Sequence, residues 1–121
     1  MADNQEAVGR GGLSVIRTDT DGVTVLDLYG EIDYQTVDAL TQAMPSADAA
    51  AVQRIVIDMS QVTFMDSSGV NALIVAYQAA TGGKGWLRLA GVRGAVLRTL
   101  QLVGIDSVIT CHPTVEDALT P

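Results

Sequence analysis

The chain has 121 residues, enough for one domain with a single hydrophobic core but not for two. Its formal net charge of −7 disfavours nucleic acids and anionic membranes as partners, because their phosphate groups repel an acidic surface. Hydrophobic residues form 48% of the chain, and no apolar stretch reaches the roughly 20 residues of a membrane helix. A single cysteine excludes an internal disulfide, and the first residues lack an export signal, so we expect a soluble, cytoplasmic protein.

The N-terminal half begins with a polar segment. Residues 1–12, MADNQEAVGRGG, lack hydrophobic periodicity and predict a flexible tail, which leaves 13–121 as the one domain. Leu13–Thr18 and Val23–Tyr29 are rich in β-branched and apolar residues and are separated by turn residues around Gly22, so they predict a β-hairpin.

A helix and a buried strand follow the hairpin. Apolar residues recur at helical spacing between Asp33 and Pro45, which predicts a first helix that starts near Asp33. Arg54–Met59, RIVIDM, is a short continuous apolar run and predicts a central strand that is covered on both faces. We expect Ser60–Met65 to be a connection.

The C-terminal half alternates between the two element types. Ser68–Ala80 predicts a second helix, Trp86–Ala90 a strand, 92–103 a third helix, Ser107–Thr110 a last strand and Thr114–Leu119 a short terminal helix. Strands that alternate with helices after an initial hairpin predict an α/β sandwich. We expect a mixed, mostly parallel sheet of four to five strands with helices packed against it.

The most informative segment is VTFMDSSGV, residues 62–70. Asp66, Ser67 and Ser68 stand between the buried strand and the second helix, where the first backbone N–H groups of a helix lack intrahelical partners. The local pattern is equally compatible with two interpretations. Asp66 or Ser67 caps the helix and does nothing else, or Ser67 is a phosphorylatable switch.

The switch interpretation follows from the chemistry of a helix start. A phosphate on Ser67 would meet unpaired N–H groups and the positive end of the helix dipole, so the fold would tolerate it. It would also add about −1.5 to −2 charge beside Asp66, which would oppose docking of a partner. Gly69 would let a partner backbone approach closely, unless it serves only helix packing.

The sequence at this point resembles the STAS domain family, specifically the bacterial anti-sigma factor antagonists. The resemblance rests on Gly30-Glu31-Ile32-Asp33, on the strand Ile55–Met59, and above all on Phe64-Met65-Asp66-Ser67-Ser68-Gly69-Val70. It extends in order from about Leu13 to Leu119. The tetrapeptide Asp-Ser-Ser-Gly is short, but its place after a buried strand and downstream of Gly-Glu-Ile-Asp makes the combination fairly specific.

The resemblance implies a partner-switching protein. In that family the unphosphorylated antagonist binds an anti-sigma factor that is also an ATP-dependent serine kinase, and this frees the sigma factor. Phosphorylation of the first serine after the aspartate abolishes binding, and a metal-dependent serine phosphatase restores it. That serine is Ser67 here. The partner surface implied by the resemblance consists of Asp33, Asp66, Ser68, Gly69, Val70 and Asn71.

Asn71 is also where the chain departs from the family, which often has a second glycine at this position. A polar amide on the first helical turn alters the fit to a partner and leaves the identity of the kinase open. Ser68 is a second candidate phosphosite, although its hydroxyl suits a backbone contact near the helix start.

Other constellations predict no catalytic, metal or cofactor site. Gly82–Gly85, GGKG, lacks the spacing of a phosphate loop, and the pair Cys111-His112 lacks further ligands or an orienting partner. We therefore expect a regulatory binding protein that is a kinase substrate and not an enzyme. The alternative is a non-catalytic STAS subunit of a lipid-transport or stress-sensing assembly. A nucleotide-binding domain has little support because no phosphate-cradling loop is present.

Overall fold

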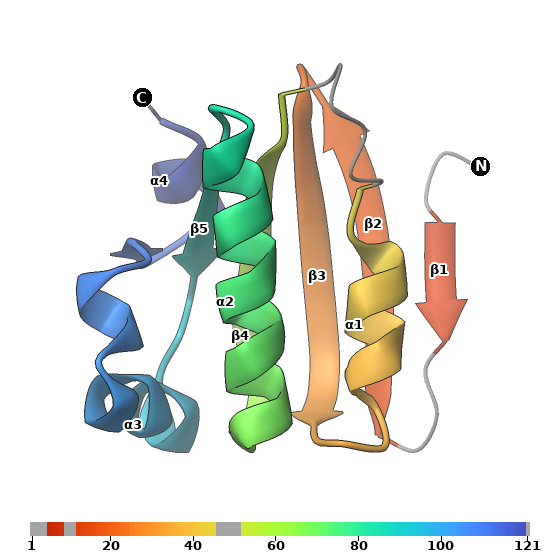
Figure 1. The fold of residues 1–121 in the computed structure, drawn as a ribbon. Coiled ribbons are helices and arrows are strands. Elements are labelled where there is room, and N and C mark those ends of the chain that lie inside the picture. The colour runs from red at the N-terminus through yellow and green to blue at the C-terminus, as the bar shows by residue number, and fades with distance from the viewer. Residues whose placement is uncertain (1–4, 9–11, 46–51, 121) are drawn as a thin grey trace.

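A computed structural model describes residues 5–8, 12–45 and 52–120 (Figure 1). The strands are β1 (Gln5–Val8), β2 (Leu13–Thr20), β3 (Val23–Ile32), β4 (Arg54–Met65), β5 (Trp86–Ala90) and β6 (Cys111–His112). The helices are α1 (Val37–Ala43), α2 (Ser67–Gly82), α3 (Gly94–Val103) and α4 (Val115–Leu119), with a short 3-10 helix at Ile105–Ser107.

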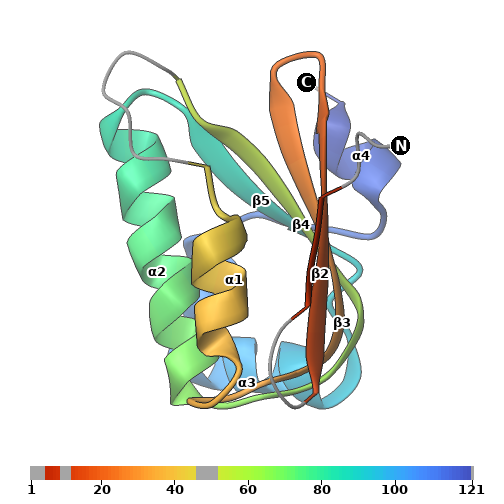
Figure 2. The same ribbon diagram turned by 90° about the vertical axis from the view of Figure 1, so that its right-hand side faces the viewer.

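The strands form one mixed sheet in the order β1-β2-β3-β4-β5-β6. The first three are antiparallel, and β3 to β6 run parallel to one another. Helices α1 and α2 lie side by side over one face, whereas α4 lies on the opposite face (Figures 1 and 2). The predicted α/β sandwich is confirmed, with six strands in place of four to five.

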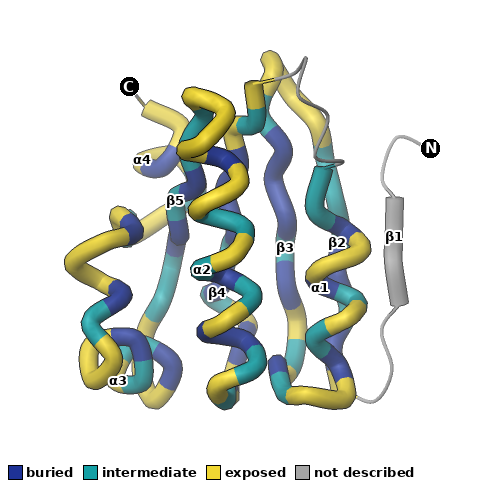
Figure 3. The backbone as a smooth tube through the Cα atoms, in the orientation of Figure 1, coloured by how far each residue is buried: buried dark blue, intermediate teal, exposed yellow. Residues whose placement is uncertain are grey.

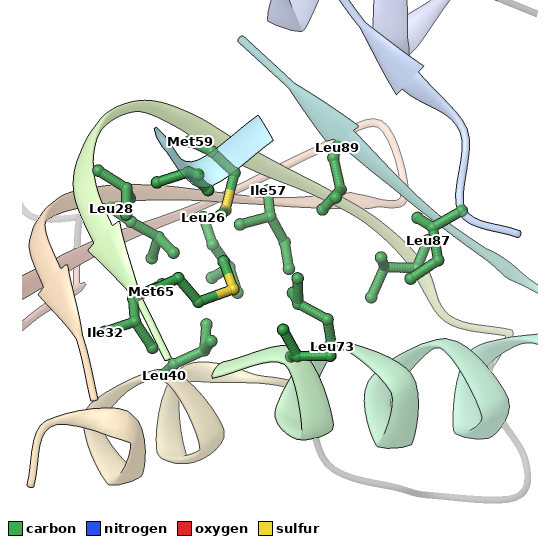
Figure 4. Close-up of a cluster of buried hydrophobic side chains, with 14 of the residues drawn as sticks. Leu26, Leu28, Ile32, Leu40, Ile57, Met59, Met65, Leu73, Leu87 and Leu89 are labelled. Carbon is green, nitrogen blue, oxygen red and sulfur yellow. The ribbon is translucent and has the colours of Figure 1, made fainter. Parts of the chain in front are cut away.

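The main core lies between the sheet and the pair α1 and α2. Alternate residues of the central strands point toward these helices, because successive side chains of a strand face opposite sides. Leu26 and Ile57, which are register partners on β3 and β4, meet Leu40 of α1 and Leu73 of α2, and all four are buried (Figure 4). Burying each such side chain stabilises the fold by about 1.5–3 kcal/mol. The outer faces of the helices are the exposed ones (Figure 3).

The segment expected to be a flexible tail contains a strand. Gln5–Val8 forms β1 and pairs with β2 in antiparallel register from Gln5↔Arg17 to Val8↔Ser14. An edge strand of this kind is held by backbone hydrogen bonds to its neighbour. Backbone hydrogen bonds do not require an alternation of apolar and polar side chains, so the sequence gives no sign of the strand. The expectation of a structureless segment is therefore wrong for these four residues. Residues 1–4 and 9–11 of the expected tail lie outside the described residues.

The central strand is longer than predicted. The expected connection Ser60–Met65 continues β4, because pairing with β3 extends to Ile32↔Met65 through two register shifts. Pairing between β4 and β5 ends earlier, at Asp58↔Ala90. The second half of β4 thus pairs with a strand on only one side. Several of its residues are polar and exposed, so this half lacks the continuous apolar run that predicted the first half.

The predicted strand Ser107–Thr110 is also wrong. Gly104, in the left-handed conformation with φ of 80°, ends α3, and the backbone then turns through the 3-10 helix. Ile109 is buried and donates its N–H to the carbonyl of Ile105 at 2.8 Å, so a turn overrides its β-branched propensity. Pairing with β5 begins at Cys111, two residues from Ile109.

No helix in the described ranges is long and apolar enough to cross a membrane.

Candidate functional site

Two aspartates meet at the carboxyl ends of β3 and β4. Ile32 and Met65 are the last register pair of these parallel strands, and Asp33 and Asp66 follow them directly. The N–H of Asp66 donates to the carbonyl of Ile32 at 3.0 Å, which ties the two strand ends together. In open α/β sheets, binding sites form outside the carboxyl ends of the strands. The structure thus brings together two residues that are 33 positions apart in the sequence, and we call this place the acidic corner.

Asp66 caps α2, and Ser67 is the first residue of that helix. The Asp66 side chain accepts the N–H of Ser68 at 2.8 Å, while its backbone carbonyl accepts the N–H groups of Gly69 and Val70 at 3.1 and 3.2 Å. The cap is therefore the carboxylate, and the Ser67 side chain is exposed and does not cap the helix. The interpretation in which Ser67 itself is the cap is wrong.

This arrangement corrects the expected surroundings of a phosphate on Ser67. Three N–H groups of the first turn, those of Ser68, Gly69 and Val70, already bond to Asp66. A phosphate on Ser67 would therefore find these three donors already bonded to the residue that precedes it. The segments 31–38 and 64–72 contain four acidic residues and no lysine, arginine or histidine. Added negative charge at this corner has no basic neighbour along these segments.

Asp33 holds a tight turn ahead of α1. Its Oδ1 atom accepts the N–H groups of Gln35 at 2.9 Å and Thr36 at 3.0 Å. The buried Thr36 hydroxyl accepts the N–H of Asp33 at 2.9 Å and donates to the carbonyl of Glu31 at 2.9 Å. This turn is why the first helix starts at Val37 and not near Asp33. Sequence reasoning missed Thr36, although Asp-x-x-Thr is a typical spacing for reciprocal side chain to backbone bonds.

Two residues expected on the partner surface are buried. A Cβ atom at Gly69 would lie 2.5 Å from Cγ of Met65 and 2.8 Å from Cγ2 of Ile32, so glycine is needed for α2 to pack against the strand ends. Val70 is 9% exposed and belongs to the main core. Both residues hold α2 against the sheet, and neither contributes to the accessible surface of the acidic corner.

The remaining expected residues are accessible. Asn71 is exposed one turn after Ser67, and Ser68 is half-buried. Sequence reasoning missed two aromatic residues near the corner: Tyr34, which is 73% exposed, and Phe64, which is 47% exposed and pairs in register with Glu31. Exposed aromatic residues are enriched in protein interfaces, and this enrichment is the signal that could have found them.

A groove between α1 and α2 adjoins the corner. It has a volume of about 500 Å³ and is lined by residues of both helices and of the start of β4. Ser68 and Asn71 form one end of its wall on α2. The sequence did not predict this groove, because it depends on how two helices are spaced over the sheet.

The pair Cys111-His112 lies on β6, away from the corner. Burial raises the pKa of the Cys111 thiol, and the carboxylate of Asp106 raises it further. A thiol is nucleophilic as the thiolate, so this environment works against reactivity. Among the described residues, no group of three or more His, Cys, Asp or Glu side chains is arranged to hold a metal ion.

Comparison with known proteins links this geometry to one family. The family profile described as the STAS domain matches residues 14–118. The anti-sigma-F factor antagonist RsfB of Mycobacterium tuberculosis is 38% identical over 112 residues, which cover 89% of this chain and 88% of RsfB.

Solved structures show the same similarity. An anti-sigma factor antagonist from Mycobacterium paratuberculosis has a TM-score of 0.76 at 34% identity, covering 88% of this chain and 91% of its own. The anti-sigma factor antagonist SpoIIAA in its unphosphorylated form has a TM-score of 0.66 at 23% identity, covering 88% and 92%. At that identity the second likeness shows the fold alone.

Proposed function

Because the chain belongs to the STAS domain family, we propose that it acts in the cytoplasm as an anti-sigma factor antagonist in a partner-switching pathway. Its unphosphorylated form binds an anti-sigma factor serine kinase and frees the sigma factor. Phosphorylation of Ser67 by that kinase blocks binding, and a serine phosphatase restores it. The 38% identity with RsfB over most of both chains supports the antagonist role.

The observation that carries the switch is the position of Ser67. It is exposed, it is the first residue of α2, and the carboxylate before it already caps the helix. Its hydroxyl is thus accessible to a kinase without any unfolding of the domain. Ser68 is a poorer substrate because it is half-buried beside the cap.

The docking surface that we propose surrounds this serine. Asp33 and Asp66 supply its acidic side, and Ser68 and Asn71 extend it along α2. Gly69 and Val70 contribute by holding α2 against the sheet beneath that surface.

Electrostatics explains why a phosphate would switch binding off. A phosphoserine adds about −1.5 to −2 charge at neutral pH. At the acidic corner this charge is added next to Asp66 in the chain, and the segments 31–38 and 64–72 contain no basic residue to pair with it. Docking of a partner would have to strip water from this doubly charged group, which is unfavourable, and the bulk of the phosphate would hold the partner away from the start of α2. The effect therefore falls on the interface and not on the fold.

The test is binding of the anti-sigma factor kinase, encoded in the same genome, to three variants of the full chain. Ser67→Ala is expected to bind like the parent chain, to resist phosphorylation by ATP and kinase, and to show no phosphate on Ser67 by mass spectrometry. Ser67→Asp is expected to bind at least tenfold more weakly. Ser107→Asp is the matched control, because it adds the same charge at an exposed serine after α3. Equal binding of Ser67→Asp and Ser107→Asp would contradict the switch.

A further inference from the structure

The end of α3 and the turn after it expose a group of large aliphatic side chains. Leu102 is 81% exposed, Val103 is 54% exposed and Val108 is 53% exposed. Leu102 is the most exposed large hydrophobic residue in the part of the chain that the structure describes. Single apolar residues on a surface are normal, but three within seven positions are a cluster of the kind that marks an interaction site. We call these three residues the α3 patch.

Buried neighbours fix the α3 patch on the outside of the fold. α3 packs on the core through Val96 and Leu100, and the following turn packs through Ile105 and Ile109. The N–H groups of Val108 and Ile109 donate to the carbonyl of Ile105 at 2.9 and 2.8 Å, which closes that turn. The exposed side chains between these anchors cannot turn inward without displacing them. The patch is therefore a permanent part of the surface, on the side of the sheet where β5 lies (Figure 1).

Two charges of opposite sign accompany the α3 patch. Arg98 lies one turn before Leu102 on the same side of α3, because residues four apart in a helix are neighbours. Asp106 lies beyond Leu102, in the 3-10 helix. Both side chains are exposed, and neither forms a hydrogen bond or an ion pair with the described part of the chain. The surface thus carries an unpaired cation and an unpaired anion, each four positions from Leu102.

This charge pattern fits a second copy of the same chain. In a dimer with two-fold symmetry, a residue i of one copy contacts residue j of the other and the reverse contact repeats it, so the surface must complement itself. When two copies meet with Leu102 near the axis and their α3 helices antiparallel, Arg98 of one protomer faces Asp106 of its partner twice. A partner surface with charges of only one sign would leave one of these two residues against a like charge.

The strength of such a contact follows from its size and from the charge of the chain. The net charge of −7 makes two copies repel at long range, but at about 0.1 M salt this repulsion is screened beyond about 10 Å. An interface centred on three residues of each copy is small, and interfaces below about 1,200 Å² are typical of weak and transient complexes. We therefore expect a dimer that forms only at high protein concentration.

We propose that the α3 patch forms a weak, two-fold symmetric dimer of this chain, with Leu102, Val103 and Val108 between the copies and Arg98 of one protomer paired with Asp106 of its partner. Burial of apolar area drives the association, and the charge pairs fix how the copies are aligned. This surface shares no residue with the docking surface proposed for the kinase.

The experiment measures dimerisation of the full chain by analytical ultracentrifugation, from about 10 μM to about 1 mM protein. The parent chain is expected to shift from monomer to dimer across this range. Leu102→Gln removes the central apolar side chain and is expected to weaken the dimer at least tenfold. Val75→Gln is the matched control, because it changes an exposed aliphatic residue on α2, and it is expected to leave the dimer unchanged. Circular dichroism checks that each variant is folded.

Charge reversal tests the pairing of the two copies. Arg98→Asp places acid against acid at both contacts of the dimer, and Asp106→Arg places arginine against arginine, so each variant alone is expected to dimerise at least tenfold more weakly. An equimolar mixture of the two variants restores both contacts between opposite charges, and the mixed dimer is expected to form as tightly as the parent dimer. Net charge cannot explain this pattern, because Asp106→Arg makes the chain less acidic and yet weakens its dimer.

Several results would overturn the proposal. These are a parent chain that stays monomeric throughout the range, a dimer that Leu102→Gln leaves intact, or a mixture of the two charge variants that associates no more tightly than either variant alone. A dimer that Val75→Gln weakens as much as Leu102→Gln would also overturn it. No kinase or ATP is present in these measurements, so their outcome is independent of the switch proposed at Ser67.

Discussion

The neighbouring strands β3 and β4 carry two pairs of aspartates that the protein treats differently. Asp27 and Asp58 are register partners in the middle of the strands, and Asp33 and Asp66 follow the strand ends. The two end carboxylates accept backbone N–H groups at 2.8 to 3.0 Å from the turn and helix that follow them. The middle pair lies where most backbone donors are already used by the sheet.

The middle pair is therefore electrostatically strained. Burial raises the pKa of Asp27 above its ordinary value of 3.8, and the charge of Asp58 and a side-chain hydrogen bond to it raise the pKa further. Asp58 also accepts the N–H of Ser60 at 2.9 Å. The end carboxylates each accept a backbone N–H, whereas burial is the main cause of the raised pKa of Asp27 in the middle pair. At the acidic corner the two carboxylates bond to backbone N–H groups beside Ser67.

The largest effect is expected from a substitution that forces α2 away from the ends of β3 and β4 and so separates Asp66 from Asp33. Gly69→Val places a branched side chain where Met65 and Ile32 already lie, and overpacking of this kind costs about 3 kcal/mol. Urea unfolding measures the loss. Gly82→Val is the control, because Gly82 is the last residue of the same helix. Apart from its chain neighbours and the nearby helix backbone, nothing lies within 4 Å of where its Cβ atom would be. Similar losses for both variants would show that Gly69 has no special packing role.

The second largest effect is expected when the buried Thr36 hydroxyl, which bonds to the backbone of Asp33 and Glu31, is removed. Thr36→Val keeps the shape of the side chain but leaves the N–H of Asp33 and the carbonyl of Glu31 without their buried hydroxyl partner. The expected loss of unfolding free energy is about 2 kcal/mol. Thr41→Val is the matched control on the exposed side of α1, where we expect a change within about 0.5 kcal/mol. A harmless Thr36→Val would mean that the turn is held by Asp33 alone.

A smaller effect separates capping from docking at the other end residue. Asp66→Ala removes the acceptor for the N–H of Ser68, and loss of such a cap costs about 1 kcal/mol. Asp66→Asn keeps a side-chain oxygen at that place, and asparagine is as good an N-cap as aspartate. We expect Asp66→Asn to retain stability but to weaken binding of the kinase, measured by calorimetry. Full binding by Asp66→Asn would show that the carboxylate acts only as a cap.

The smallest effect has the opposite sign and concerns the middle pair. A raised pKa means that the folded state holds the Asp27 proton more tightly than the unfolded state, so stability falls as pH rises through the raised pKa. The amide introduced by Asp27→Asn cannot ionise, so this variant is expected to have a higher melting temperature than the parent chain at pH 7. The gain should shrink as pH falls toward 3.8.

Melting curves between pH 4 and pH 8 measure this difference. Asp21→Asn is the control, since it removes one charge from an exposed turn residue with φ of 51°, a conformation that asparagine tolerates. A gain for Asp27→Asn that does not vary with pH would rule out the ionisation of Asp27 as its cause.

Local patterns carried much of the fold. The hairpin, the buried strand from Arg54, the helix after Asp66 and the strand Trp86–Ala90 were all predictable, because apolar periodicity and turn residues act over a few neighbouring positions. The same locality made the segment around Ser67 recognisable as the start of a helix. β1 could not be predicted in this way, since its partner supplies the hydrogen bonds.

The sequence by itself determined that a serine and an aspartate stand at a strand-to-helix junction in a STAS-like α/β domain. Only the tertiary structure decided that Asp66 and not Ser67 caps the helix, that Gly69 is buried against Ile32 and Met65, and that Asp33 lies at the same sheet edge. The physical reason is register. Two parallel strands joined by a helix bring distant residues together, and no local pattern of side chains encodes which positions will meet.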